Sequence, residues 1–327
     1  RGQPRLANGL MAIHKVDIAI IGTGTAGMGA YRAAREHGNS LVLIEGGPYG
    51  TTCARVGCMP SKLLIAAGEA AETVREAGGF GVHAPAPRID GKAVMQRVRD
   101  ERDRFVGFVK EAVEGFDPDH RIRAKARFTG PHTLALDNGD RIEAARIVIA
   151  TGSAPVKPGI FDIVGDRLIV NDDVFHWADL PQSVSVFGAG AIGLEMAQAL
   201  SRLGVRVRLF GKGGGVGGIS DPKLRDVAAR LFAANLPFLP DADIEDISRD
   251  GDAVVIRFAE DGTSREERFD WLLAATGRNP ALDGLNLAAS GLVLNERGIP
   301  KIDPQTMQAD GSHIFFAGDV AARIPLL

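Results

Sequence analysis

The segment from Val16 to Glu45 reads VDIAIIGTGTAGMGAYRAAREHGNSLVLIE. It opens on a short apolar run typical of a buried parallel strand, and it continues through a GxGxxG turn into a helical stretch and a second apolar run, LVLI. The turn glycines are Gly22, Gly24 and Gly27. Strand, glycine turn, helix, strand and a terminal acid at Glu45 form the pattern of a unit that binds a dinucleotide, with the pyrophosphate at the helix N-terminus and the acid on a ribose.

The same pattern recurs downstream, where SVSVF at 183–187 precedes a second GxGxxG turn, the helical stretch LEMAQALSRLG and the strand VRVRLF. The second set of turn glycines is Gly188, Gly190 and Gly193. Each unit is followed by a strand that ends in ATG, RIVIATGS and WLLAATGRNP, and before each ATG lies a meander with turn residues at Asp137–Asp140 and Glu260–Thr263. The repeat predicts two dinucleotide sites in one chain. The alternative is that either turn merely packs a helix on a strand.

Composition narrows the class of protein. The 327 residues suggest about two domains, and 45% apolar with 24% charged residues is ordinary for an α/β protein. A net charge of −3 provides no broad cationic face for nucleic acid, and no apolar run is long enough for a membrane span. Residues 1–14 are expected to be a leader, with Met11 as the expected start, and without a secretory signal the chain is expected in the cytoplasm.

Both cysteines of the chain lie close together, Cys53 and Cys58 in GTTCARVGCMPSKLL. A disulfide across so short a loop is a poor structural staple, so a redox role is favoured over a structural one. A zinc site is not expected, because no second pair of ligands accompanies them. Pro60 suits the first turn of a helix predicted to run to Ala77, which places Cys58 at its N-terminus. There the helix dipole favours thiolate and is expected to lower the thiol pKa.

A regular helix would separate the two cysteine α-carbons by roughly 7.5 Å of rise alone, too far for a disulfide. A bond between them therefore requires a distorted backbone. Lys62 in the first helical turn opposes the helix dipole, so it is expected to have a partner; the alternative is a solvated surface lysine.

The order GxGxxG, acid, CxxxxC, ATG, GxGxxG, ATG, GD resembles the FAD-dependent pyridine nucleotide-disulfide oxidoreductases from Lys15 to the last residue, and within them the dihydrolipoyl dehydrogenases most. The resemblance implies FAD in the first site and NAD or NADP in the second. The implied FAD contacts are Gly22, Gly24, Thr25, Ala26, Gly27, Glu45, Gly46, Thr51, Thr52, Cys53, Lys62, Ala126, Thr151, Gly152, Ser153, Arg278, Gly318 and Asp319. The implied NAD or NADP contacts are Gly188, Gly190, Ala191, Ile192, Gly193, Glu195, Lys212 and Gly277.

The resemblance also implies roles. Cys58 is the thiol nearest the flavin and gives a long-wavelength thiolate–flavin band, Cys53 exchanges with a small-molecule or lipoyl dithiol, and Lys62 pairs with Glu195 beside the flavin. The family continues into an interface domain whose His, in an HxxxxE pattern, serves as acid and base across a homodimer. None of the seven histidines here has Glu at that spacing, so we expect this chain to be a truncated form.

The second site departs from the pattern that selects NAD. Gly211 stands where an acid is expected after the strand, and Lys212 follows, with Arg206 and Arg208 on the strand itself. These cations could favour the 2′-phosphate of NADP. Alternatively, Gly211 only begins the glycine-rich run GKGGGVGG and selects nothing.

The predicted fold class is α/β, with two Rossmann-like three-layer domains, the second inserted in the first. The flavin domain is expected at 15–154 and 283–327, and the NAD(P) domain at 155–282. The expected activity is electron transfer between NAD(P)(H), FAD and a Cys53–Cys58 disulfide in a dihydrolipoyl dehydrogenase. Mercuric reductase, glutathione reductase and a non-catalytic dinucleotide-binding fragment are the alternatives.

Overall fold

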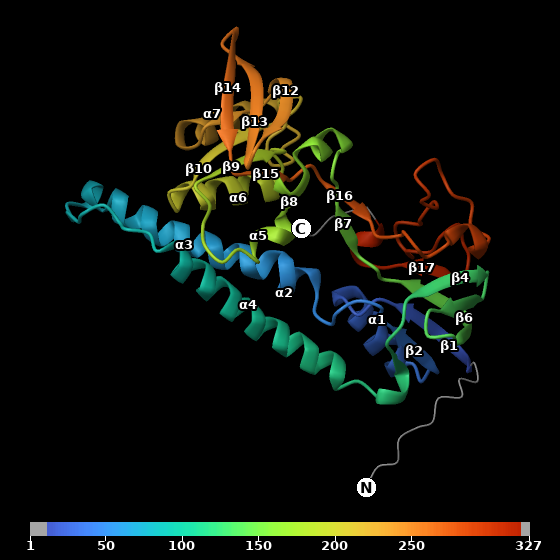
Figure 1. Cartoon of the computed structure of the whole chain (residues 1–327). Helices are drawn as coiled ribbons and strands as arrows, with labels where there is room; N and C mark the ends of the chain where they lie inside the picture. Colours follow the sequence, from blue (N-terminus) through green and yellow to red (C-terminus); the bar gives the residue numbers. More distant parts are fainter. Residues whose placement is uncertain (1–11, 322–327) are drawn as a thin grey trace. The chain divides into compact units, whose positions relative to one another are not determined.

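The computed structural model describes residues 12–321 (Figure 1). Most of the predicted leader, with Met11, and residues 322–327 of the predicted flavin domain lie outside the described residues. Within the described part, the chain divides into two compact units: the first contains 12–52, 106–154 and 279–321, and the second contains 53–105 and 155–278. Residues 53–105, assigned above to the flavin domain, thus group with the second unit. Which cofactor each domain holds stays a prediction.

The first unit is built on a seven-stranded sheet with the order β3-β2-β1-β6-β5-β4, in which β17 also pairs with β6. Its strands are β1 (Ile13–Ile21), β2 (Leu41–Ile44), β3 (Arg121–Ile122), β4 (Ala126–Gly130), β5 (Thr133–Leu136), β6 (Arg141–Ile149) and β17 (Ile314–Phe316). β1 is central and parallel to both neighbours, with Ile20 opposite Leu43 on one side and Val148 on the other. Both apolar runs of the first fingerprint are therefore buried strands, as predicted.

The second unit has a five-stranded parallel sheet with the order β11-β10-β9-β15-β8 and a separate antiparallel meander, β12-β13-β14. The sheet strands are β8 (Leu168–Val170), β9 (Ser183–Phe187), β10 (Arg206–Phe210), β11 (Phe238–Leu239) and β15 (Trp271–Ala274). The meander strands are β12 (Asp243–Asp250), β13 (Ala253–Glu260) and β14 (Thr263–Phe269). The predicted α/β class with two Rossmann-like units is confirmed.

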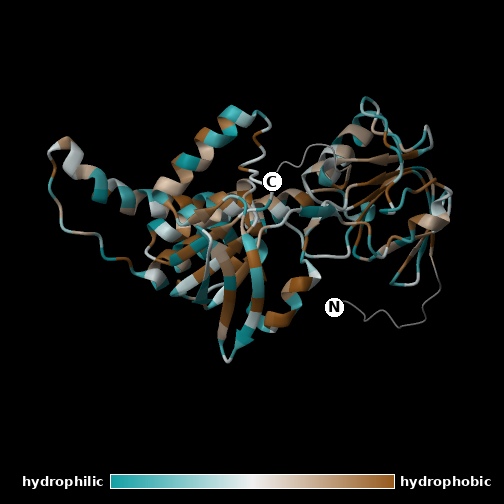
Figure 2. Ribbon diagram, turned by 90° about the horizontal axis from the view of Figure 1, so that it is seen from above, coloured by the Kyte–Doolittle hydropathy of each residue, from teal (hydrophilic) through white to brown (hydrophobic). Residues whose placement is uncertain are grey.

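The helices of the fingerprints are α1 (Thr25–Glu36) and α6 (Ala191–Arg202). The other helical elements and short strands are α2 (Thr52–Val56), α3 (Cys58–Glu76), η1 (Ala77–Phe80), α4 (Gly91–Glu114), η2 (Pro118–His120), β7 (Ser153–Pro155), η3 (Gly159–Arg167), α5 (Asn171–Val174), α7 (Pro222–Asn235), β16 (Arg278–Pro280), η4 (Leu287–Ser290) and η5 (Gly318–Ala321). Figure 2 shows hydrophobic residues gathered on the central strands and mixed with hydrophilic ones along the long helices. None of the described helices has an apolar stretch that would span a bilayer.

Alternation along β10 gives the sheet of the second unit two different faces. Val207 and Leu209 pack into the core that includes α3 and α6, whereas Phe210 packs into the core formed with the meander. Arg206 and Arg208 share the face of Phe210. Arg208 lies 2.8 Å from Glu260 and 2.6 Å from Glu267, and its guanidinium stacks over a meander phenylalanine.

Arg206 makes a similar contact, 3.3 Å from Glu267. The suggestion that Arg206 and Arg208 favour a 2′-phosphate is therefore wrong, because their position in the strand alternation directs them to acidic residues of the meander instead.

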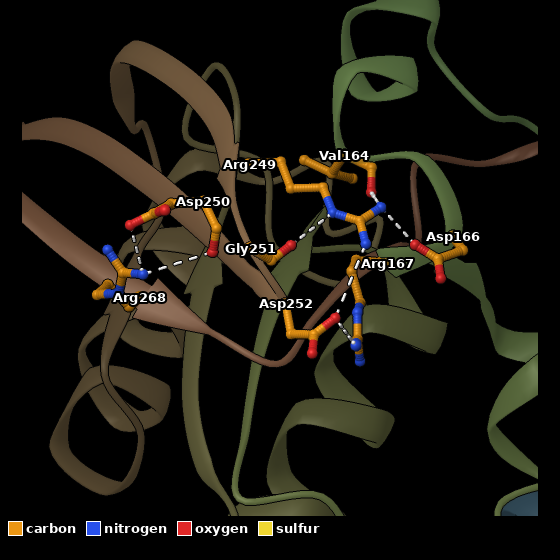
Figure 3. A network of polar contacts seen from close by, with 8 residues as sticks. All are labelled: Val164, Asp166, Arg167, Arg249, Asp250, Gly251, Asp252 and Arg268. Atoms are coloured by element: carbon orange, nitrogen blue, oxygen red, sulfur yellow. Dashed lines mark hydrogen bonds and ion pairs between the residues drawn. The ribbon is translucent and has the colours of Figure 1, made fainter.

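A polar network in the second unit connects η3 to the turn between β12 and β13 (Figure 3). Arg249 donates to the carbonyl oxygens of Gly251 at 2.8 Å and Val164 at 3.2 Å. Arg167 lies 2.6 Å from Asp252 on the same turn. These contacts hold η3 against the β12–β13 turn of the meander.

Candidate active site and nucleotide-binding loops

The three positions of the first fingerprint are occupied by glycine for different structural reasons. A Cβ at Gly22, whose φ is +109°, would lie 2.4 Å from the carbonyl oxygen of Ala150, and one at Gly27 would lie 1.9 Å from that of Gly22. Both glycines are required for the close packing of α1 on β1 and β6. Gly24 has no atom within 4 Å of the position its Cβ would take. Nothing in the described protein therefore requires a glycine at 24, which fits a backbone left open for a pyrophosphate.

The second fingerprint repeats this geometry. A Cβ at Gly188, whose φ is +108°, would lie 2.3 Å from the carbonyl oxygen of Ala275, and one at Gly193 would lie 1.8 Å from that of Gly188. Gly190 again has no atom within 4 Å of its missing Cβ. The two turns thus share the same backbone shape and the same open position at the N-terminus of a helix, where anions bind.

Glu45 follows β2 with its carboxylate already oriented. Oε2 accepts hydrogen bonds from the backbone N–H of Thr23 at 2.9 Å and from its hydroxyl at 2.8 Å, and Oε1 accepts from the N–H of Gly47 at 2.7 Å. These donors fix the carboxylate beside the glycine turn, where an acid binds ribose hydroxyls. The first site therefore fits the adenosine half of a dinucleotide.

The predicted FAD contacts are divided between the two units. The first unit holds Gly22, Gly24, Thr25, Ala26, Gly27, Glu45, Gly46, Thr51, Thr52, Ala126, Thr151, Gly152, Ser153, Gly318 and Asp319. Within that unit, the hydroxyl of Ser153 lies 3.4 Å from Oδ2 of Asp319. A Cβ at Gly318 would lie 2.9 Å from the methyl group of Ala26. The first ATG motif, through Ala150 beside Gly22, and the GD motif, through Gly318 beside Ala26, thus both reach the first fingerprint. Cys53, Lys62 and Arg278 belong to the second unit.

The predicted NAD or NADP contacts all belong to the second unit: Gly188, Gly190, Ala191, Ile192, Gly193, Glu195, Lys212 and Gly277. At Gly211, after β10, a Cβ would lie 2.4 Å from the carbonyl oxygen of Pro240. This close approach gives Gly211 a packing reason and leaves no room there for an acidic side chain. Lys212 is exposed beside it.

The backbone between the two cysteines is broken, as a bond between them requires. α2 ends at Val56 and α3 begins at Cys58, and Gly57 between them has φ −123° and ψ −124°, outside the helical region. Both cysteines are free thiols, and Cys53 is near enough to Cys58 to raise the pKa of its thiol. The predicted helix from Cys58 is confirmed, with its end at Glu76.

The predicted lowering of the Cys58 pKa is wrong for this dithiol. Burial, as the largest cause, and the neighbouring Cys53 raise the pKa of Cys58 to about 11, although the charge of Lys62 opposes them. Loss of water around the sulfur thus outweighs the position at a helix N-terminus. Cys58 keeps its proton at neutral pH in the state described here.

Lys62 has the predicted partner. Its Nζ lies 2.6 Å from Oε1 of Glu195 on α6. The two helices approach closely at Gly68, where a Cβ would lie 3.2 Å from the carbonyl oxygen of Ala199. Because the side chains of Lys62 and Glu195 are 59% and 38% exposed, the pair stabilises the fold by only about 0–1 kcal/mol. Its consequence is to fix the ammonium group near Cys58.

Sequence reasoning missed a buried amide beside the thiols. Asn171, the first residue of α5, donates from Nδ2 to the carbonyl oxygen of Val56 at 3.2 Å. A signal was present in the run NDD directly after the apolar strand LIV, because Asn and Asp favour helix starts. Nothing local in the sequence connects that run to the cysteines.

Comparison with known proteins decides the family. The model of the pyridine nucleotide-disulphide oxidoreductase family matches residues 16–327. The chain belongs to this family. Its members use FAD and NAD(P)H, and the two fingerprints, each with an open middle glycine, fit two dinucleotides.

Similar proteins include different enzymes of the family. A mercuric reductase from Streptomyces lividans is 32% identical over 317 residues, which cover 94% of this chain and 66% of that protein. A dihydrolipoyl dehydrogenase from Chlamydia trachomatis is 29% identical over 318 residues, with the same coverage of 94% and 66%. The chain thus spans just under two thirds of the length of these relatives.

Among solved structures, the HOCl-induced flavoprotein disulfide reductase RclA from Escherichia coli superimposes with a TM-score of 0.78 at 23% identity. The match covers 95% of this chain and 67% of that one. At this identity the likeness supports the fold.

The glycine geometry predicts different effects for two neighbouring substitutions. Gly188→Ala should destabilise the protein by about 2 kcal/mol or more, because its Cβ would meet a backbone carbonyl. Gly190→Ala should change stability by less than about 1 kcal/mol yet weaken NAD(P)H binding at least tenfold. Urea unfolding and nucleotide fluorescence titration measure the two effects. Unchanged NAD(P)H affinity in folded Gly190→Ala would contradict a pyrophosphate at this turn.

The raised pKa predicts slow alkylation of Cys58 at neutral pH. In the reduced chain, the rate of its reaction with iodoacetamide should rise about tenfold per pH unit from pH 7 to 10, because the thiolate fraction grows until pH reaches the pKa of about 11. Trypsin cleaves after Arg55, so mass spectrometry reads Cys53 and Cys58 separately.

Lys62→Met should slow Cys58 alkylation further at each pH, because the ammonium charge lowers the Cys58 pKa. The exposed Lys92 provides the matched control, and Lys92→Met should leave the rate unchanged. A Cys58 rate that is already level between pH 7 and 8 would mean a low pKa and contradict the prediction.

Proposed function

We propose that the protein is a flavoprotein disulfide oxidoreductase in which Cys53 and Cys58 form the redox-active pair. The observation that carries the proposal is the pair of neighbouring free thiols on either side of a helix break, in a chain of the pyridine nucleotide-disulphide oxidoreductase family. The first fingerprint, with Glu45, binds FAD, and the second binds NAD or NADP. When bound, FAD supplies the two-electron chemistry between a nicotinamide and the thiol pair.

The chain's own residues perform thiol–disulfide exchange. In the oxidised form, a substrate thiolate attacks the sulfur of Cys53, a new S–S bond forms, and the Cys53–Cys58 bond breaks with Cys58 as the leaving thiolate. The second substrate thiolate then displaces Cys53, which leaves a substrate disulfide and a reduced pair. Lys62, held by Glu195, favours the departing Cys58 thiolate, because its charge lowers the Cys58 pKa. Its role is electrostatic, at the sulfur that gains charge.

We propose a small dithiol of the dihydrolipoyl type as substrate, for an enzyme that acts as a homodimer in the cytoplasm. Support comes from the dihydrolipoyl dehydrogenase relatives and from a thiol pair suited to a two-thiol substrate. A second candidate is Hg(II) reduction, favoured by the 32% identical mercuric reductase. Glutathione disulfide is the third candidate substrate. The pair Cys53 and Cys58 serves all three chemistries.

We further propose that the second site accepts NADP through Lys212. An acidic side chain, which would repel a 2′-phosphate, has no room at Gly211 because of the Pro240 carbonyl. Lys212 is exposed at the same strand end, and no ion pair of Lys212 is found among residues 12–321. Arg206 and Arg208 pair with acidic residues of the meander, so we assign the 2′-phosphate to Lys212.

The central test of the proposal is thiol counting in the FAD-loaded chain under anaerobic conditions. One equivalent of NAD(P)H should convert the oxidised pair to two alkylatable thiols, located at Cys53 and Cys58 by mass spectrometry. The Cys58→Ser variant, which cannot form the pair, should gain none. The reduced wild type is then mixed with lipoamide, glutathione disulfide or Hg(II), and the fastest reoxidation identifies the substrate class. If NAD(P)H consumption releases no thiols, the redox pair is refuted.

Lys212→Ala should weaken NADPH binding about five- to tenfold and leave NADH binding within twofold, because only NADPH carries the 2′-phosphate. Tryptophan fluorescence quenching in nucleotide titrations measures both constants. Lys110→Ala, which removes an exposed lysine of the first unit, provides the control and should alter neither. If Lys212→Ala weakens both nucleotides equally, or neither, Lys212 does not select NADP. Packing against Pro240 would then be the whole reason for a glycine at position 211.

A further inference from the structure

The carbonyl oxygen of Val56 ends helix α2 inside the protein. Val56 is 6% exposed, and the chain leaves the helical path at Gly57, so this carbonyl cannot continue a regular helical bonding pattern. The last carbonyls of a helix need outside donors, and a buried carbonyl without one is costly. Here the donor is Nδ2 of Asn171, 3.2 Å away, from a residue that is itself 6% exposed. A buried amide thus supports the break between the cysteines.

The orientation of that amide is fixed by its neighbours. Nδ2 of Asn171 also donates to Oδ1 of Asp172 at 2.9 Å. Nη1 of Arg278, whose side chain is 6% exposed, lies 3.5 Å from Oδ1 of Asn171 and 3.4 Å from Oδ1 of Asp172. Because a guanidinium only donates, it holds the amide oxygen on its own side. The amide nitrogen is thereby directed at Val56.

The broken backbone determines how near the two thiols are. Five residues of continuous helix would separate them by roughly 7.5 Å of rise alone. In the structure the helix is broken at Gly57, and Cys53 lies near enough to Cys58 to raise the pKa of its thiol. A disulfide can then form with little backbone movement. Pro60, four residues after Val56, has no N–H to give this carbonyl, so the amide of Asn171 supplies the donor that the helix cannot. Without the bond from Asn171, the reduced segment around Gly57 is free to shift, and closing the disulfide would have to undo that shift.

We propose that Asn171, oriented by Asp172 and Arg278, is a positioning residue that sets the dithiol–disulfide equilibrium of Cys53 and Cys58. The proposal rests on the proposed function, in which these cysteines are the redox pair. Asn171 acts through the backbone of Val56 and Gly57. Its effect is to keep the two thiols at high effective concentration with respect to each other, which makes their disulfide harder to reduce.

The equilibrium is measured against glutathione. Oxidised glutathione accepts two electrons from the two thiols, the Cys53–Cys58 bond forms, and two molecules of reduced glutathione leave with the two protons. The full chain, loaded with FAD, is equilibrated anaerobically over a series of glutathione ratios, quenched by acid and alkylated. Mass spectrometry then gives the fraction of disulfide, and hence the equilibrium constant.

Asn171→Ala removes the donor, and Asn171→Asp keeps the size but turns the donor into an acceptor facing the Val56 carbonyl. Each should lower the equilibrium constant for disulfide formation about tenfold, which is a rise of about 30 mV in reduction potential. Asn39→Ala is the matched control: Asn39 also donates to a helix-end carbonyl, that of Ala34 at 3.3 Å, but in the first unit. It should leave the constant within twofold of the wild type.

The outcomes separate this inference from the function itself. If the wild type forms no Cys53–Cys58 disulfide at any glutathione ratio, the proposed function fails. If the wild type forms it and the Asn171 variants match the wild-type constant, the positioning role fails. The role also fails if Asn39→Ala lowers the equilibrium constant as much as the Asn171 variants do. It fails as well if both Asn171 variants give the equilibrium constant of the wild-type chain unfolded in guanidinium, because Asn171 would then be needed for the whole fold and not for the thiol pair in particular.

Discussion

The structure depends on the contact between a helix start and the strands beneath it, where no side chain fits. At Gly22 and Gly27 in the first unit, and at Gly188 and Gly193 in the second, a Cβ would overlap a backbone carbonyl. This constraint brings each helix N-terminus to the carboxyl edge of its parallel sheet. The middle glycine of each turn is then left facing open space, and the same constraint that forms the fold also forms the anion site.

The thiol pair shows two physical effects in opposition. A position at a helix N-terminus and a neighbouring lysine both favour thiolate at Cys58, but burial and the adjacent Cys53 favour the thiol, and the second pair of effects is larger. Cys58 therefore holds its proton at neutral pH when the pair is reduced. Proximity of the two sulfurs comes from the backbone break, which is supported by the buried Asn171.

Much of the fold could be predicted because its signals are local. Buried parallel strands read as apolar runs, and the helix from Cys58 follows from Pro60 in its first turn. The partner of Lys62 was predictable only through resemblance, since Glu195 is distant in sequence. Arg206 and Arg208 were misjudged because their partners lie on a meander whose face the strand pattern alone does not reveal.

The sequence by itself determined the two glycine turns, the acid that follows the first of them and the close spacing of the thiols, because each depends on residue type at short range. Only the tertiary structure decided that the Cys58 pKa is raised, that Gly211 faces the Pro240 carbonyl, and that Asn171 reaches Val56. Burial and hydrogen bonding between distant segments depend on how the chain packs, and no local pattern encodes which segments meet.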